Sequence, residues 1–174
     1  GNWDAIFAGL TVFGMDFFNE TWNGWVFYLT QYSACWTTPG QSALKTMIGW
    51  NIEIMFMFAI SGIIFYNSLS EDKSEKILGI PNRWFWAIGY SAFCVFVECL
   101  LIMGGHLVWE YPWWNRSYGG IWLIFFFGYF EFYVAAILVL SLKTNQAKAI
   151  SVATLYTIVF LANFICMGLL GWMY

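Results

Sequence analysis

The sequence contains few charged residues. Only 10% of its 174 residues are charged, whereas a soluble domain carries roughly 25%. Seven basic residues against ten acidic residues give a formal charge of −3, and no basic run is present. The low charge excludes a water-soluble globule, and the missing basic run excludes the electrostatic surface of a nucleic-acid-binding protein. We therefore expect no nucleic-acid partner.

Metal-binding and hydrolase motifs are also scarce. His106 is the only histidine, and the four cysteines form no CxxC or metal-type spacing. A carboxylate-bridged di-iron centre requires Glu-x-x-His motifs on two helices, and neither is present. Iron and copper chemistry are therefore disfavoured and no cofactor is expected, although a hard cation bound by carboxylates stays open. The chain has no GxSxG, HExxH, GxGxxG or P-loop pattern, which disfavours soluble-type hydrolases.

Long stretches without a cation make up most of the chain. Hydrophobic residues account for 61% of the sequence and aromatic residues for 23%. Five stretches are long enough to cross a bilayer, which takes about 20 apolar residues per helix, and their continuous apolar runs favour helices over barrel strands. We predict an all-α, polytopic integral membrane helix bundle that forms one domain over residues 1–174. Its predicted spans are about 5–29, 44–66, 84–108, 120–142 and 149–172.

The loop cations predict the orientation of this bundle. The loops after the second and fourth predicted spans hold five of the seven basic residues: Lys73, Lys76, Arg83, Lys143 and Lys148. The loops after the first and third spans hold only Lys45 and Arg116. The positive-inside rule then places the N-terminus in the cytoplasm and the 110–120 loop outside. Trp113 and Trp114 suit the headgroup layer, so we expect that loop to lie along the membrane interface.

Five acidic residues fall inside the predicted spans, without lysine or arginine beside them: Asp16, Glu20, Glu53, Glu98 and Glu131. An ionised side chain at mid-bilayer costs on the order of 3 kcal/mol or more, so such acids are neutral, ligated or in contact with water. At a rise of about 1.5 Å per residue, the four glutamates lie roughly 14 to 17 Å from the outer ends of four helices. We therefore expect the glutamates to converge as catalytic acids and bases, with Asp16 as a modulator.

Polar and aromatic residues near the same level extend the predicted pocket. Asn19 and Asn23 share a helix face with Asp16 at helical spacing. His106 lies one turn before Glu110, with which it would form a hydrogen-bonded pair. Aromatic rings near the acids would line a lipophilic pocket, where ring faces attract cations. The predicted substrate-binding residues are Asn19, Asn23, Asn51, Trp22, Trp50, Tyr129, Tyr133 and His106.

Three classes of function agree with this layer of acids. The favoured class is an enzyme that isomerises or cyclises a lipophilic, isoprenoid- or sterol-like substrate by proton donation and removal. The second is a non-catalytic lipid- or pigment-binding protein, or an accessory subunit of a larger membrane complex. The third is a proton or cation transporter, which the absence of a repeat disfavours. Alternatively, the acids have only a structural role, in which their protonated side chains form hydrogen bonds between helices. Each such bond would stabilise the bundle by about 0.6 kcal/mol.

In composition the chain broadly resembles small integral-membrane terpene or carotenoid cyclases, which also combine a short helical chain with intramembrane acids and many aromatic residues. The resemblance implies isoprenoid chemistry in the membrane. The Pro-x-Glu-Glu element of the carotenoid type is absent, since the nearest segment, Phe127 to Phe132, holds one acid and no proline.

Overall fold

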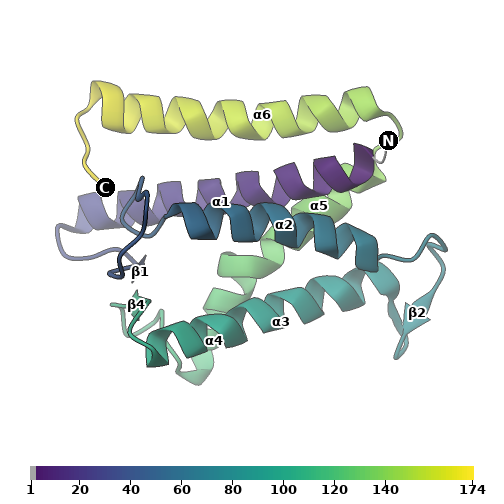
Figure 1. Ribbon diagram of the computed structural model, residues 1–174, viewed down its shortest axis with the longest axis horizontal. Coiled ribbons are helices and arrows are strands. Elements are labelled where there is room, and N and C mark those ends of the chain that lie inside the picture. Colours follow the sequence, from purple (N-terminus) through teal and green to yellow (C-terminus); the bar gives the residue numbers. More distant parts are fainter. Residues whose placement is uncertain (1–2) are drawn as a thin grey trace.

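In the computed structural model, which describes residues 3–174, the chain makes five helical crossings, and each runs opposite to the one before it (Figure 1). The fourth crossing is continuous, because α4 passes through the π-helical segment η1 into α5. The helical elements are α1 (Trp3–Thr30), α2 (Ile52–Ser68), α3 (Asn82–Met103), α4 (Tyr118–Ile124), η1 (Phe125–Phe130), α5 (Glu131–Ser141), α6 (Asn145–Asn163) and the π-helical segment η2 (Phe164–Leu169).

Three of the crossings are long and apolar enough to span a membrane: Asn82–Met103, Tyr118–Ser141 and Asn145–Leu169. The helix Ile52–Ser68 is also apolar but shorter. The 28-residue helix α1 is more polar, and it lies inside the bundle against α2, α5 and α6. Neighbouring helices thereby shield its polar face from acyl chains. The predicted all-α membrane bundle is confirmed.

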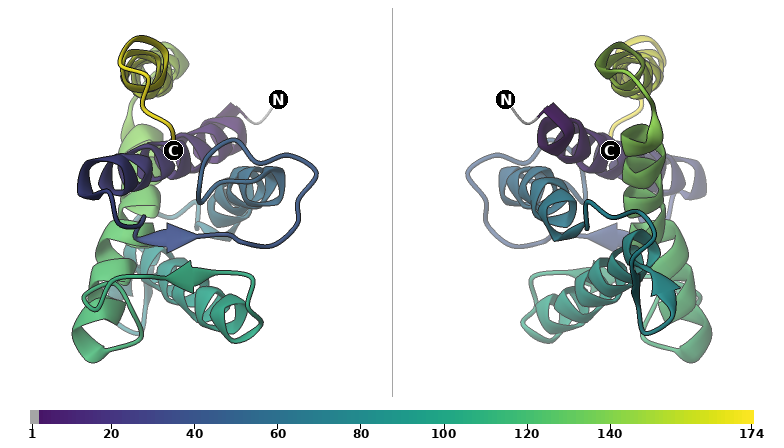
Figure 2. Two further views of the ribbon diagram at one scale, coloured as in Figure 1. Left: turned by 90° about the vertical axis from the view of Figure 1, so that its left-hand side faces the viewer. Right: turned by 90° about the vertical axis from the view of Figure 1, so that its right-hand side faces the viewer.

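The order of the helices leaves α1 and α2 at the centre. Figure 2 views the bundle from its two ends and shows α6 at one edge, α3 at the opposite edge and the α4–α5 helix passing beside them. The helices α1 and α2 approach each other through glycines: a Cβ atom at Gly62 would lie 2.5 Å from the Ala8 carbonyl oxygen and 2.7 Å from the Gly9 Cα. Small residues at such crossings allow two backbones to pack closely.

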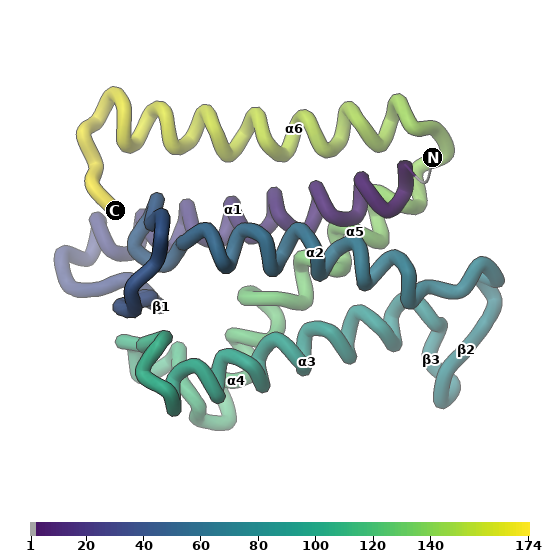
Figure 3. The backbone as a smooth tube through the Cα atoms, in the orientation of Figure 1, coloured from purple at the N-terminus to yellow at the C-terminus, as the bar shows by residue number. Residues whose placement is uncertain are grey.

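A short antiparallel strand pair lies at each end of the bundle. Strand β1 (Trp36–Thr37) pairs with β4 (Val108–Trp109), which ties the loop after α1 to the loop after α3. Strands β2 (Lys76–Ile77) and β3 (Ile80–Pro81) form a hairpin between α2 and α3. The tube in Figure 3 follows the chain through both connections. That the β1–β4 end faces outward stays a prediction.

The start of α2 differs from the sequence-based prediction. The helix predicted over 44–66 begins only at Ile52, because Asn51 is its N-cap and its side-chain oxygen accepts a hydrogen bond from the Ile54 amide (2.9 Å). Capping by an asparagine side chain satisfies an amide that the helix itself leaves free. The segment before Asn51 is a loop, with an isolated bridge between Lys45 and Asn51. This loop packs against the middle of α1, where Gly49 approaches Glu20 and Trp50 stacks on Phe17.

Candidate functional site

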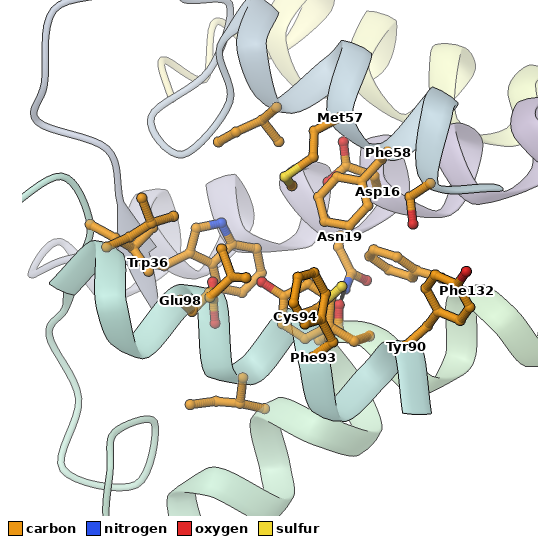
Figure 4. A pocket seen from close by; sticks show the side chains of 18 of the residues that line it. Asp16, Asn19, Trp36, Met57, Phe58, Tyr90, Phe93, Cys94, Glu98 and Phe132 are labelled. Atoms are coloured by element: carbon orange, nitrogen blue, oxygen red, sulfur yellow. Dashed lines mark hydrogen bonds between the residues drawn. The ribbon is translucent and has the colours of Figure 1, made fainter. Parts of the chain in front are cut away.

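A cavity of about 410 Å³ lies between α1, α2, α3 and the α4–η1–α5 helix (Figure 4). Its volume falls in the range of about 300 to 1,000 Å³ that is typical of small-molecule sites. Most of its lining is apolar. The polar side chains at its wall include five of the residues predicted from the sequence: Asp16, Asn19, Glu20, Glu98 and Tyr129.

Two acids of α1 are held by indole N–H groups. Trp50 Nε1 donates to Asp16 Oδ2 at 2.6 Å, and Trp36 Nε1 donates to Glu20 Oε1 at 2.8 Å. Trp50 is itself fixed by stacking on Phe17, with ring centroids 4.7 Å apart. Asp16 and Glu20 are each 3% exposed and lie one turn apart on the face of α1 that borders the cavity. Both carboxyl groups therefore have a fixed orientation.

Two carboxyl oxygens at the cavity have no partner. Glu20 Oε2 and Glu98 Oε2 are buried and accept no hydrogen bond from any residue in the described part of the chain. The two carboxyl groups come from different helices, close enough for their charges to interact, and Glu98 lies beside Tyr129. An unpaired buried polar group costs about 1 to 3 kcal/mol, more when it is charged. Glu20 and Glu98 are thus two lining residues whose buried carboxyl oxygens have hydrogen-bonding capacity that residues 3–174 do not use.

Asn19 connects α1 to the π-helical segment. Its Nδ2 donates to the carbonyl oxygens of Phe127 (2.9 Å) and Gly128 (3.3 Å), while its Oδ1 accepts from Trp22 Nε1 (2.8 Å). The wider π turn interrupts the regular ladder of backbone hydrogen bonds, and such turns occur frequently at functional sites. This anchor fixes η1 where Tyr129 borders the cavity.

Asn23 supports the site from outside the cavity. Its Nδ2 donates to the Trp36 carbonyl oxygen at 2.9 Å, and its Oδ1 accepts from the backbone amides of Cys35 (2.8 Å) and Trp36 (3.3 Å). The side chain is fully buried and does not line the cavity. Its amide is thus used to hold the loop that carries Trp36, in contrast to the predicted contact with substrate.

Two of the predicted glutamates lie apart from the cavity. Glu53 is exposed in the first turn of α2, where its Oε2 accepts from Ser42 Oγ at 2.6 Å. Its predicted depth is wrong because α2 begins eight residues later than expected, at Ile52. Glu131 is half-buried at the start of α5, near Asn19, and does not line the cavity. The acids that converge are therefore those of α1 and α3.

The remaining predicted binding residues have other positions. His106 is exposed, and Asn51 caps α2, so neither borders the cavity. Trp22 donates a hydrogen bond to Asn19, and Trp50 donates one to Asp16. The buried Tyr133 hydroxyl lies 2.7 Å from Ser61 Oγ, next to the cavity wall. Trp22, Trp50 and Tyr133 therefore shape the wall without lining the cavity.

The sequence did not mark several residues that line the cavity. Trp36 comes from the loop after α1 and stacks on Trp114, with ring centroids 5.5 Å apart, and Trp22 meets both rings edge-on. Trp114 belongs to the loop predicted to lie along the membrane interface, and its side chain is only 3% exposed. The pairing of β1 with β4 brings the two loops together, and no sequence motif signals that pairing. The other unmarked side chains include Phe58, Ser61, Tyr90, Cys94 and Phe132.

No group of three or more His, Cys, Asp or Glu side chains among residues 3–174 is arranged to hold a metal ion. The two acids of α1 and Glu98 of α3 thus do not form a ligand set for the hard cation that the sequence left open.

The close contact at Gly49 gives a testable prediction. A Cβ atom there would lie 2.5 Å from Glu20 Oε2 and 2.7 Å from Trp36 Nε1. Gly49→Ala is expected to displace this pair, to lower the free energy of unfolding by about 1 to 3 kcal/mol and to shift tryptophan emission. Thermal unfolding and fluorescence in detergent measure both effects. Gly89→Ala is the control, since nothing lies within 4 Å of its Cβ position; equal behaviour of the two variants would contradict the contact.

Comparisons with known proteins place the chain among membrane proteins. Residues 1–168 match the model of an uncharacterized membrane protein family. The chain is 47% identical over 148 residues to an uncharacterized protein of Archaeoglobus fulgidus, an alignment that covers 85% of this chain and 69% of the relative. No solved structure matches the chain. Because the family match covers nearly the whole sequence, the chain belongs to this family of integral membrane proteins.

Proposed function

We propose that the chain is a membrane-embedded enzyme that acts on a lipophilic molecule by acid–base chemistry, with Glu20 and Glu98 as the reacting groups. One observation carries this proposal: these two glutamates, from different helices, both line one apolar cavity, and each has a buried oxygen without a partner among residues 3–174. Intramembrane acids mark functional sites by default. A pair of carboxyl groups can supply both an acid and a base.

The reaction that best suits this pair is isomerisation or cyclisation of an isoprenoid- or sterol-like alkene. The protonated carboxyl group gives its proton to one alkene carbon, so that a C–H bond forms and the neighbouring carbon becomes positive. In cyclisation, a second double bond attacks this carbon and forms a C–C bond. The other carboxylate then removes a proton, and the electrons of that C–H bond form a new double bond. One proton enters and one leaves, so no oxidant or reductant is needed.

Aromatic rings around the cavity support a positively charged intermediate. Trp36, Phe58, Trp114, Tyr129 and Phe132 all belong to its lining. Ring faces attract cations by about 0.5 to 2 kcal/mol each, with the larger values in desolvated sites. Trp36, which stacks on Trp114, lies directly beside Glu20, because its indole N–H donates to that carboxyl group. Proton donation and cation stabilisation would thus occur in one place.

Asp16 and Tyr129 are proposed to tune the two reacting acids. Asp16 lies one turn before Glu20, close enough for the charges of the two carboxyl groups to interact, so the two groups do not readily carry a negative charge at the same time. Tyr129 lies beside Glu98 and can exchange a hydrogen bond with it. Glu20 and Glu98 therefore have different surroundings, which favour a state in which one is protonated and the other is ionised. An acid–base pair needs such a state.

A non-catalytic lipid- or pigment-binding role is the second candidate, because the same apolar lining would hold such a molecule without turnover. The two functions separate in one experiment. The protein is reconstituted in vesicles in D₂O with an isoprenoid alkene, geranylgeraniol, and the alkene is recovered for mass spectrometry. The enzyme is expected to yield isomerised or cyclised product that carries deuterium at carbon. Geranylgeraniol that binds at a 1:1 ratio without deuterium uptake would support the binding role and contradict catalysis on this substrate.

A further inference from the structure

We infer that the lipophilic ligand reaches the cavity sideways from the hydrocarbon layer, through an opening between α2 and α3. This inference rests on the proposed function, since it concerns the route to the same cavity. It defines the substrate class more narrowly: a slender, membrane-dissolved molecule with a long apolar body, as opposed to one that arrives from water.

Four apolar side chains mark the opening, because they line the cavity and are also exposed on the outside of the bundle. Met57, Ile60 and Ile64 of α2 are 43%, 51% and 49% exposed, and Phe93 of α3 is 60% exposed. The three α2 residues are spaced three and four apart, so they form one stripe along the helix. The cavity therefore reaches the surface where α2 faces α3.

Both ends of the space between α2 and α3 are closed. At the β1–β4 end, the side chains of Trp36, Leu107 and Trp114 belong to the lining and are at most 7% exposed. At the hairpin end, Ser68 of α2 lies within hydrogen-bond distance (2.7 Å) of the Tyr90 hydroxyl of α3. A contact between α2 and α3 thus closes the hairpin end and buried loop side chains close the other end, so the exposed part of the lining lies between them.

The position of the opening along α2 favours access from the hydrocarbon layer over access from water. Ile60 lies eight residues after Ile52, the first residue of α2, which corresponds to about 12 Å along the helix axis. A hydrocarbon layer is about 30 Å thick, so this position falls within it. All four exposed side chains of the opening are apolar, which suits acyl or isoprenoid chains and not a hydrated solute. The carboxyl oxygens of Glu20 and Glu98 then meet the functional end of a molecule whose tail extends toward the bilayer.

The route is tested with a photoreactive lipid. Wild-type protein and variants in phosphatidylcholine vesicles are mixed with vesicles that contain a diazirine-bearing geranylgeraniol, and the time course of labelling at cavity peptides is followed by mass spectrometry. Ile60→Trp, which narrows the opening, is expected to slow labelling at least tenfold. Phe93→Ala, which widens it, is expected to accelerate labelling about threefold or more.

Matched controls lie outside the cavity lining on the same helices. Phe56 of α2 and Phe96 of α3 are 63% and 57% exposed and do not border the cavity, so Phe56→Trp and Phe96→Ala are expected to label at the wild-type rate. If Ile60→Trp and Phe93→Ala are both labelled at the wild-type rate, the lateral route is overturned, whereas the proposed ligand site in the cavity is not. Wild-type protein that is not labelled at any cavity peptide would overturn the proposed lipid site and the route together.

Discussion

Replacement of Glu98 by glutamine is expected to lower turnover of a lipophilic alkene by about 10²- to 10⁴-fold, the usual contribution of a general acid or base. Glutamine keeps the size and hydrogen-bonding ability of the side chain but neither donates nor accepts the reacting proton. Glu98 Oε2 has no partner among residues 3–174, so the substitution removes no internal hydrogen bond from that atom. We therefore expect folded protein with nearly unchanged thermal stability.

Glu20→Gln and Glu53→Gln make the Glu98 experiment specific. Glu20 borders the same cavity and is expected to show a similar loss, whereas Glu53 is exposed at the start of α2 and is expected to stay within twofold of wild type. Deuterium incorporation in D₂O is the measurement for all three variants. Equal losses of folded protein for Glu20→Gln and Glu98→Gln, without a selective loss of turnover, would show that these acids only stabilise the bundle.

Replacement of Asn23 by leucine is expected to cause the largest loss of stability. The substitution leaves the Cys35 and Trp36 amides and the Trp36 carbonyl without the Asn23 side chain, all in the interior. Each buried group without a partner costs about 1 to 3 kcal/mol, so a loss of about 3 kcal/mol or more is expected. Chemical unfolding in detergent, followed by tryptophan fluorescence, measures the effect.

Asn67→Leu is the matched control for Asn23→Leu. Asn67 is exposed near the end of α2, and surface substitutions usually change stability by less than about 0.5 kcal/mol. Because Asn23 positions the Trp36 loop, surviving Asn23→Leu protein is also expected to bind the lipid probe more weakly. An unfolding free energy equal to that of Asn67→Leu would show that Asn23 does not hold the loop.

The helices were the most predictable part of the molecule, because apolar stretches between cations determine where a chain can cross a bilayer. The convergence of α1 and α3 acids was predictable for the same reason: Glu20 and Glu98 lie at similar distances from the ends of antiparallel helices. Glu53 escaped this reasoning since Asn51 starts α2 late, and an N-cap within an otherwise apolar stretch changes the depth of every residue after it.

The loops and the π-helical segment were not predictable from composition or spacing. Trp36 and Trp114 enter the cavity because two distant loops pair as β1 and β4, a tertiary contact without a local signal. The widened turn at η1 contacts Asn19, which donates to carbonyl groups more than 100 residues away in the chain. Asn23 illustrates the same difficulty, because its polar side chain on the predicted face serves the loop and not the cavity.

Glu20 and Glu98 are proposed to meet a lipophilic molecule inside a cavity within the membrane. An experimental structure of the protein in lipid nanodiscs, with geranylgeraniol added, tests this claim most directly. We predict elongated density that enters between Ile60 and Phe93 and ends within hydrogen-bond distance of both carboxyl groups. A collapsed space between α2 and α3, with the two carboxyl groups turned to separate partners, would contradict it.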